Sequence, residues 1–188
     1  MDSIDWLCEM LLIRAQLPAD AAIRLLHELA AVLEEHRNQE VHDGSLEEFV
    51  LRDLENFEGG KHLRLVTVIF DLVKEAGITP DDLLDSLYQT TEEEWAEYFF
   101  AQFVRTCWTD VEPQPELWDT QAAAFVRVAE IMGLAGKATQ LMSDLQNFPY
   151  RKRLEILNRT YNVSIPALSR APEEEPKPPR SRMPRLPG

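Results

Sequence analysis

The stretch from Lys61 to Ala76 constrains the fold of this chain most strongly, because its apolar and polar residues separate cleanly at helical spacing. Placed on a helix at about 100° per residue, its apolar side chains fill an arc of roughly 220°. That arc holds Leu63, Leu65, Val66, Val68, Ile69, Phe70, Leu72 and Val73. A strand would need alternating polarity and is rarely so long. The stretch therefore predicts a central helix that its neighbours cover on most sides.

The remaining segments also carry helical patterns, so we predict an all-α fold. It is a single compact domain over residues 1–168, with eight or nine helices packed around the central one. The other helices are expected at about 4–16, 18–38, 45–57, 80–89, 91–108, 117–132, 136–146 and 150–161. Helix-start signals support three of these bounds, because Ser45, Thr79 and Thr91 each precede an acidic first turn. Segment 91–108 has a wide apolar arc and is a second candidate for a buried helix.

The last part of the chain has no helical periodicity. Residues 163–168 are expected to lie against the domain as an extended segment, and six prolines fall between Pro172 and Pro187. We therefore predict a disordered, partly polyproline tail rich in Pro and Arg over residues 169–188. The PxxP motifs at 176–179 and 184–187 fit a plain spacer better than a ligand for an SH3 domain.

The net charge of −14 limits the classes of partner. The tail from Ala171 has three acids and four bases, a net of +1, so residues 1–170 carry −14 − 1 = −15. Such acidity disfavours direct binding to nucleic acid or to an anionic membrane surface, and it fits a basic protein partner. No apolar run reaches the length of a membrane span. Two cysteines, no CxxC motif and no signal peptide predict a reduced, cytoplasmic setting.

Motifs for catalysis or for metal and cofactor binding are weak or missing, and we expect no cofactor. His36 and Glu40 are spaced to share a metal, but a third ligand would have to come from elsewhere, so we interpret them as a solvated helix end. The dipeptide His42-Asp43 is similar to the one in helical metal-dependent phosphohydrolases. In that family it lies inside an apolar helix, whereas here it precedes a helix start, so we interpret it as chance. Cys8 and Cys107 occupy apolar positions typical of inert core thiols.

Two acidic stretches remain as candidate surfaces. Residues 34–58 carry nine acids and two bases, and residues 81–97 carry seven acids and no base. Aromatic residues flank the second stretch, so acids could steer a basic partner and aromatics could anchor it. The predicted partner-binding residues are Tyr88, Glu92, Glu93, Glu94, Trp95, Tyr98 and Phe100. The alternative is that both stretches are only solvated faces.

Three hypotheses for function follow. The first is a non-enzymatic, acidic protein-binding module, adaptor or chaperone-like, that holds a basic or amphipathic protein segment. The second is an acidic inhibitor, either an immunity protein or a nucleic-acid mimic, that blocks a basic site. The third is an enzyme with an unrecognised helical active site, in which carboxylates would act with His27 or His62.

Overall fold

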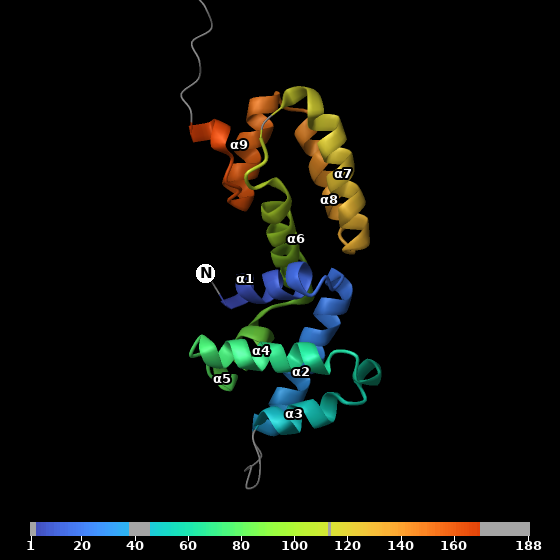
Figure 1. Cartoon of the computed structure of the whole chain (residues 1–188), viewed down its shortest axis with the longest axis vertical. Coiled ribbons are helices and arrows are strands. Elements are labelled where there is room, and N and C mark those ends of the chain that lie inside the picture. The colour runs from blue at the N-terminus through green and yellow to red at the C-terminus, as the bar shows by residue number, and fades with distance from the viewer. Residues whose placement is uncertain (1–2, 38–45, 113, 170–188) are drawn as a thin grey trace, which may run out of the picture.

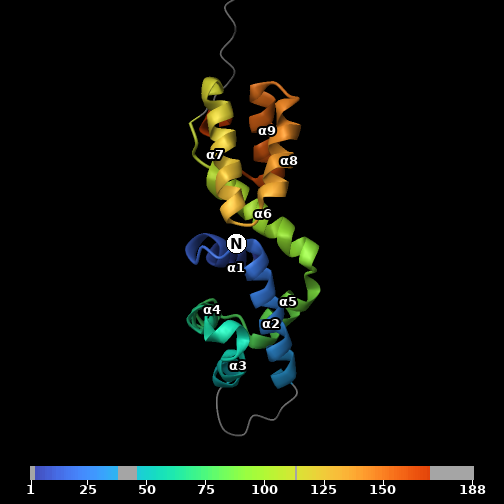
Figure 2. The same cartoon turned by 90° about the vertical axis from the view of Figure 1, so that its right-hand side faces the viewer.

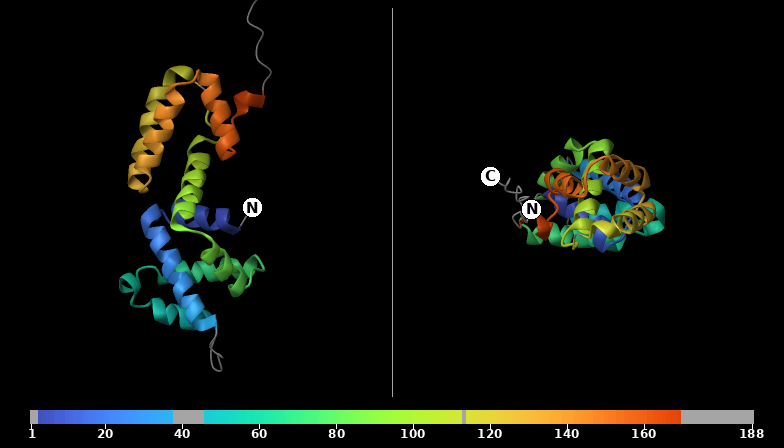
Figure 3. Two further views of the ribbon diagram at one scale, coloured as in Figure 1. Left: turned by 180° about the vertical axis from the view of Figure 1, so that it is seen from behind. Right: turned by 90° about the horizontal axis from the view of Figure 1, so that it is seen from above.

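The computed structural model describes residues 3–37, 46–112 and 114–169, and these helices form two groups joined by one long helix. In Figure 1, α2 to α5 make the lower group, and α7 to α9 make the upper group around the far end of α6. The first helix lies across the junction (Figures 1 and 2). Seen from above, the upper group lies over the lower one, so the molecule is elongated in the direction that leads from one group to the other (Figure 3).

Within the described ranges the structure contains nine α-helices and no β-strand, which confirms the predicted all-α fold. The α-helices are α1 (Ser3–Cys8), α2 (Ala19–Arg37), α3 (Leu46–Leu54), α4 (Leu63–Glu75), α5 (Pro80–Gln89), α6 (Glu92–Trp108), α7 (Trp118–Ile131), α8 (Ala135–Gln146) and α9 (Tyr150–Tyr161). Short turns of other types are η1 (Glu9–Arg14), η2 (Phe57–Gly60), η3 (Pro115–Leu117) and η4 (Pro166–Ser169). None of the described helices is both long and apolar enough to cross a bilayer.

The helix predicted at 61–76 forms, but it is not the centre of the fold. α4 buries one face through Val66, Ile69 and Val73, packs mainly on α3, and leaves Val68 40% exposed. The inner positions belong to α2 and α6, which contact the largest number of other helices. The central-helix prediction was wrong because an apolar arc shows how much of a helix can be buried, not how much its neighbours cover.

The prediction that the segment after Thr91 is a buried helix is confirmed. Trp95 and Phe99 of α6 are fully enclosed, and Phe103 is 2% exposed. The start of α6 follows the sequence signal, because Thr91 and Glu94 form a reciprocal capping box. Residue Thr79 forms the same arrangement with Asp82 at the start of α5.

The first predicted helix, 4–16, divides into α1 and a π-helical segment, η1. π-Helical turns are rare and place side chains at a different angle from α-helical turns. Here the consecutive residues Met10, Leu11 and Leu12 are all buried. The chain then turns at Gln16, whose φ of 52° lies in the left-handed region, and it enters α2.

The upper group is held together by stacked aromatic rings rather than by close approach of α6 and α7. Phe103 of α6 stacks on Phe125 of α7 with ring centroids 5.0 Å apart. Trp108 and Trp118 stack in the same way at 5.2 Å. Offset stacks of this kind stabilise beyond the area they bury. Large rings at this interface space the two helix backbones apart.

A few contacts connect the α7–α8 pair to α2 and to the first half of α6. The backbone N–H of Ala19 donates to the carbonyl oxygen of Met132 at 2.9 Å, so the start of α2 is tied to the end of α7. Gly133 follows with φ of 70°, and a Cβ there would lie 3.3 Å from Oδ1 of Asp20. Lys137 of α8 also pairs with Glu97 of α6. These contacts fix the position of the α7–α8 pair above α2.

The segment after α9 lies against the upper group, as predicted for residues 163–168. Val163 is fully buried, Ile165 is 5% exposed, and the chain closes with the 3-10 turn η4 rather than remaining extended. The carbonyl oxygen of Ser164 accepts a hydrogen bond from the backbone N–H of Asp110 at 2.9 Å. The predicted disordered tail falls on residues 170–188, which lie outside the described residues.

Candidate functional site

The acids of the predicted partner-binding surface lie in the first turn of α6, where Glu92, Glu93 and Glu94 are all exposed. Glu94 serves the capping box, since its Oε2 accepts from the backbone N–H of Thr91 at 2.8 Å. Glu92 Oε1 lies 3.4 Å from Nδ1 of His27 on α2. Within the described ranges, Glu93 is therefore the one carboxylate of the three without a hydrogen-bond or ion-pair partner. Two of the three acids already stabilise the fold.

The four aromatic residues of that predicted surface divide into two pairs. Trp95 is 0% exposed and Phe100 is 3% exposed, whereas Tyr88 is 55% and Tyr98 is 38% exposed. Trp95 packs on Phe99 with ring centroids 6.0 Å apart. Trp95 and Phe100 are therefore core residues, which corrects their predicted role as anchors. Tyr88 and Tyr98 are accessible, and their role stays a prediction.

The histidine of the proposed metal pair is a packing residue instead. His36 is 7% exposed, and its Nε2 lies 2.6 Å from Oδ2 of Asp53 on α3, so the prediction of a solvated helix end was wrong. Its possible metal partner, Glu40, and the dipeptide at 42–43 lie outside the described residues. In the described part of the chain, no three His, Cys, Asp or Glu side chains gather as metal ligands would.

A second histidine closes the turn before α4. His62 Nε2 lies 2.7 Å from Oε2 of Glu58, and Arg24 of α2 lies 3.3 Å from the other carboxylate oxygen. Glu58, Gly59 and Gly60 all have positive φ, at 47°, 68° and 73°. A glutamate in that region is strained. The hydrogen bond from His62, helped by Arg24, lowers the pKa of the Glu58 carboxyl. These bonds hold the strained turn against α2.

We expect this turn to make the protein less stable in acid. The folded pKa of Glu58 lies below its ordinary value of 4.5, so its contribution to stability is full above about that pH. The contribution is lost as the pH falls through the lowered, folded pKa. Urea unfolding at several pH values between about 3 and 6 should show this loss, and Glu58→Gln should make the curve flatter. A Glu55→Gln control at a neighbouring exposed position should leave the slope unchanged.

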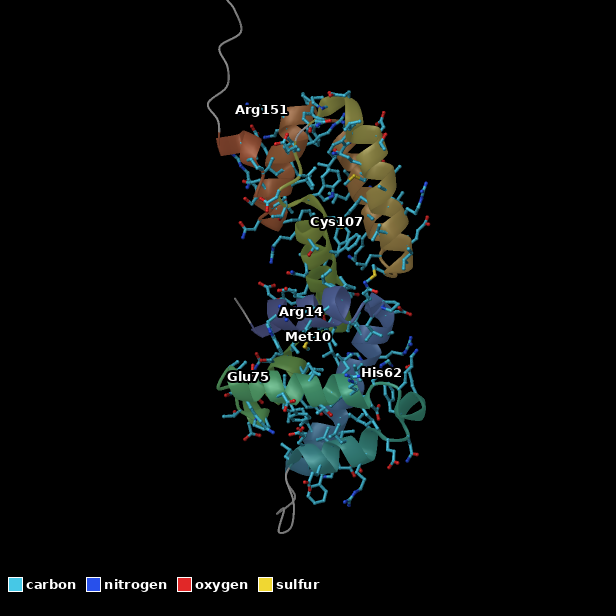
Figure 4. The ribbon with its side chains drawn as sticks, viewed as in Figure 1. Met10, Arg14, His62, Glu75, Cys107 and Arg151 are labelled. Atoms are coloured by element: carbon cyan, nitrogen blue, oxygen red, sulfur yellow. The ribbon has the colours of Figure 1, made fainter. Side chains whose placement is uncertain are left out.

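An accessible apolar groove, which sequence reasoning did not find, lies between α6, α7 and η1. One part, of about 270 Å³, lies among Cys107, Val111, Ala124 and Val128. A second part, of about 420 Å³, lies among Ile13, Cys107, Val128 and Ile131. The two parts adjoin one another because both are lined by Cys107 and Val128, and together we call them the apolar groove. Figure 4 labels Cys107 on α6 beside α7, with Arg14 of η1 below it.

The lining of the apolar groove contains no charged side chain. Its polar members are Gln16, Thr106 and Gln121, and its lining also includes Phe103 and Phe125. Burial raises the pKa of the Cys107 thiol to about 11, so this thiol stays neutral and behaves as an apolar wall. An uncharged trough on so acidic a protein suits the binding of apolar side chains better than it suits acid–base chemistry.

The apolar groove exists because α7 presents two apolar stripes. Its buried stripe contains Trp118, Ala122, Phe125 and Ala129. The adjacent stripe contains Ala124, Val128 and Ile131, and the last two are 45% and 71% exposed. This second stripe was the signal in the sequence that could have revealed the groove. Its three apolar residues, at spacings of four and three, lie on a helix face that the core does not cover. The other side of α7 meets α8 across a wider hollow of about 740 Å³ whose lining includes Asp119, Arg127 and Glu130.

Comparison with known proteins identifies no relative of this chain. No protein-family model matches it, no curated protein matches it significantly, and no solved structure does so either. The groove and the charge are therefore the features that bear on function.

Proposed function

We propose that this protein is a non-enzymatic binding module, adaptor or chaperone-like, that holds an amphipathic, basic segment of another protein in the apolar groove. The observation that carries the proposal is the exposed stripe with Val128 and Ile131 beside an uncharged trough. An amphipathic helix places apolar residues on one face at spacings of three and four, and such a face fits a groove between helices.

The charge of the domain favours a basic partner over an acidic one. Residues 1–170 carry a net charge of −15 once the tail is subtracted from the total of −14. Acids lie next to the groove in sequence at one end, because Asp110 and Glu112 flank Val111. No ion pair forms at these two acids within the described ranges. We infer that they neutralise basic residues on the outer face of the bound segment.

The acidic first turn of α6 has a secondary role in this proposal. Exposed acids such as Glu93, together with Tyr88 and Tyr98, contribute to the field that draws a positively charged segment toward the protein. This long-range attraction depends on salt, whereas insertion of apolar side chains into the groove does not. Added salt should therefore slow association more than it speeds dissociation.

A peptide titration tests the proposal. The probe is a synthetic helical peptide with leucines on one face and lysines on the other, labelled for fluorescence anisotropy. Val128→Lys places a positive charge and a long side chain in the middle of the groove, so we expect binding at least about 10-fold weaker, or ~1.4 kcal/mol. A peptide with glutamates in place of the lysines should bind more weakly than the lysine peptide.

Val68→Lys is the matched control, because Val68 is 40% exposed on α4, far from the groove in sequence and in the fold. It should bind the lysine peptide like the unchanged protein. Circular dichroism confirms that each variant is folded. Equal affinities for the two variants would show that the groove is not the binding site.

A further inference from the structure

We infer that the chain's own C-terminal segment, residues 180–187, occupies the apolar groove and competes with the partner. The inference rests on the proposed function, because it treats the same groove as the binding site and adds its regulation. The argument depends on where the described chain ends, on how far the remaining residues reach, and on the side chains they carry.

The segment after α9 approaches one end of the groove. The hydrogen bond from Asp110 to Ser164 ties this segment to the residue preceding Val111, which lines the groove. Five residues later the turn η4 ends at Ser169, on the side of α9 away from α7 (Figure 1). The remaining residues must therefore span the distance back to the groove.

The remaining residues are long enough to reach the groove. Met183 lies 183 − 169 = 14 residues beyond Ser169. This stretch contains four prolines, so it behaves as a semi-rigid spacer with a reach of about 43 Å at ~3.1 Å per residue. Tethering raises the local concentration of the segment near the groove, so even weak contacts can keep it there for part of the time.

The side chains of this segment match the groove in spacing and in charge. A polyproline II helix repeats every three residues, so Met183 and Leu186 fall on the same side, about 9 Å apart. The groove stripe from Ala124 to Ile131 extends about 10 Å along α7. Arg182 and Arg185 fall together on a different side of such a helix, where they can meet the acidic surface of the domain.

This segment also resembles the proposed partner in its chemistry. Residues 176–188 contain four bases and no acid, namely Lys177, Arg180, Arg182 and Arg185. It therefore combines two apolar anchors with positive charge, which is the combination that the groove and the acidic domain favour. A partner has to displace this internal competitor, so the measured affinity of the full chain is lower than that of the open groove.

Disulfide trapping in the full-length chain tests the inference. Met183→Cys is combined with Ala124→Cys in a Cys107→Ala background, which leaves only the fully buried Cys8 as a native thiol. The matched control replaces Ala124→Cys with Ala123→Cys. Both alanines are exposed and adjacent on α7, but Ala123 lines the α7–α8 hollow instead of the apolar groove.

We expect an intramolecular disulfide to form at least about 10-fold faster with Ala124→Cys than with Ala123→Cys. Equal rates, or no bond in either protein, would overturn the inference. Crosslinked dimers whose yield rises with protein concentration would overturn it too, in favour of a tail from a second copy. The titration measures peptide binding and the trapping measures tail occupancy. Weaker peptide binding by Val128→Lys without a disulfide from the tail would therefore keep the proposed function and overturn only this inference.

Discussion

Replacing Trp95 with alanine is expected to lower the free energy of unfolding by about 3–5 kcal/mol, the range for removing a large aromatic side chain from a core. Trp95 is 0% exposed and lies between the rings of Tyr98 and Phe99 at 6.3 and 6.0 Å. Its removal leaves a cavity near the N-terminal end of α6. Urea unfolding followed by circular dichroism measures the loss.

Two further variants separate packing from partner binding. Tyr98→Ala, at a position 38% exposed, should cost much less than Trp95→Ala. Trp95→Phe should also cost less, because the indole Nε1 has no hydrogen-bond partner to lose. If Trp95→Ala kept its stability but lost peptide binding, Trp95 would be the anchor that the sequence suggested, and the assignment to the core would be wrong.

Arg153→Ala is expected to cost about 2–3 kcal/mol, a large effect for a surface cation. Its Nε donates to the carbonyl oxygen of Phe148 at 2.8 Å, and its Nη2 donates to that of Gln146 at 3.3 Å. Its guanidinium carbon lies 5.0 Å from the ring centre of Trp118. Arg153 therefore satisfies carbonyl groups at the end of α8 and also stacks on a core ring of α7.

The controls for Arg153 use the same helix. Arg153→Lys keeps the charge but cannot reproduce the two-pronged donation, so it should recover only part of the lost stability. Arg159→Ala, at an exposed position near the end of α9, should change stability by less than about 0.5 kcal/mol. Equal effects at Arg153 and Arg159 would show that net charge matters and the contacts of Arg153 do not.

Local signals in the sequence predicted the helices well. Thr79 and Thr91 mark helix starts because each side-chain oxygen accepts a hydrogen bond from the backbone N–H three residues later. This bond depends only on residues that are close in sequence, so it can be predicted without the fold. The bounds predicted for the last helix, 150–161, match α9. The predicted centre was wrong because packing order depends on contacts distant in sequence, and α2 and α6 meet more neighbours than α4 does.

The candidate site was less predictable than the fold. The acids at Glu92–Glu94 are exposed as expected, but the sequence could not show that Trp95 points inward, because both faces of α6 are rich in aromatic residues. The apolar groove needed coordinates, since Ile13, Cys107 and Val128 meet there only after folding. The hypotheses of an acidic inhibitor and of an unrecognised enzyme stay predictions from composition.

The two walls of the groove, η1 and α7, are far apart in sequence, so they are synthesised at different times. Ile13 of η1 is translated well before Ile131 of α7, which follows after most of the domain. Until both have emerged, neither wall has its counterpart, so the groove cannot be complete on a nascent chain. The proposed partner could therefore bind only after most of the domain has been synthesised.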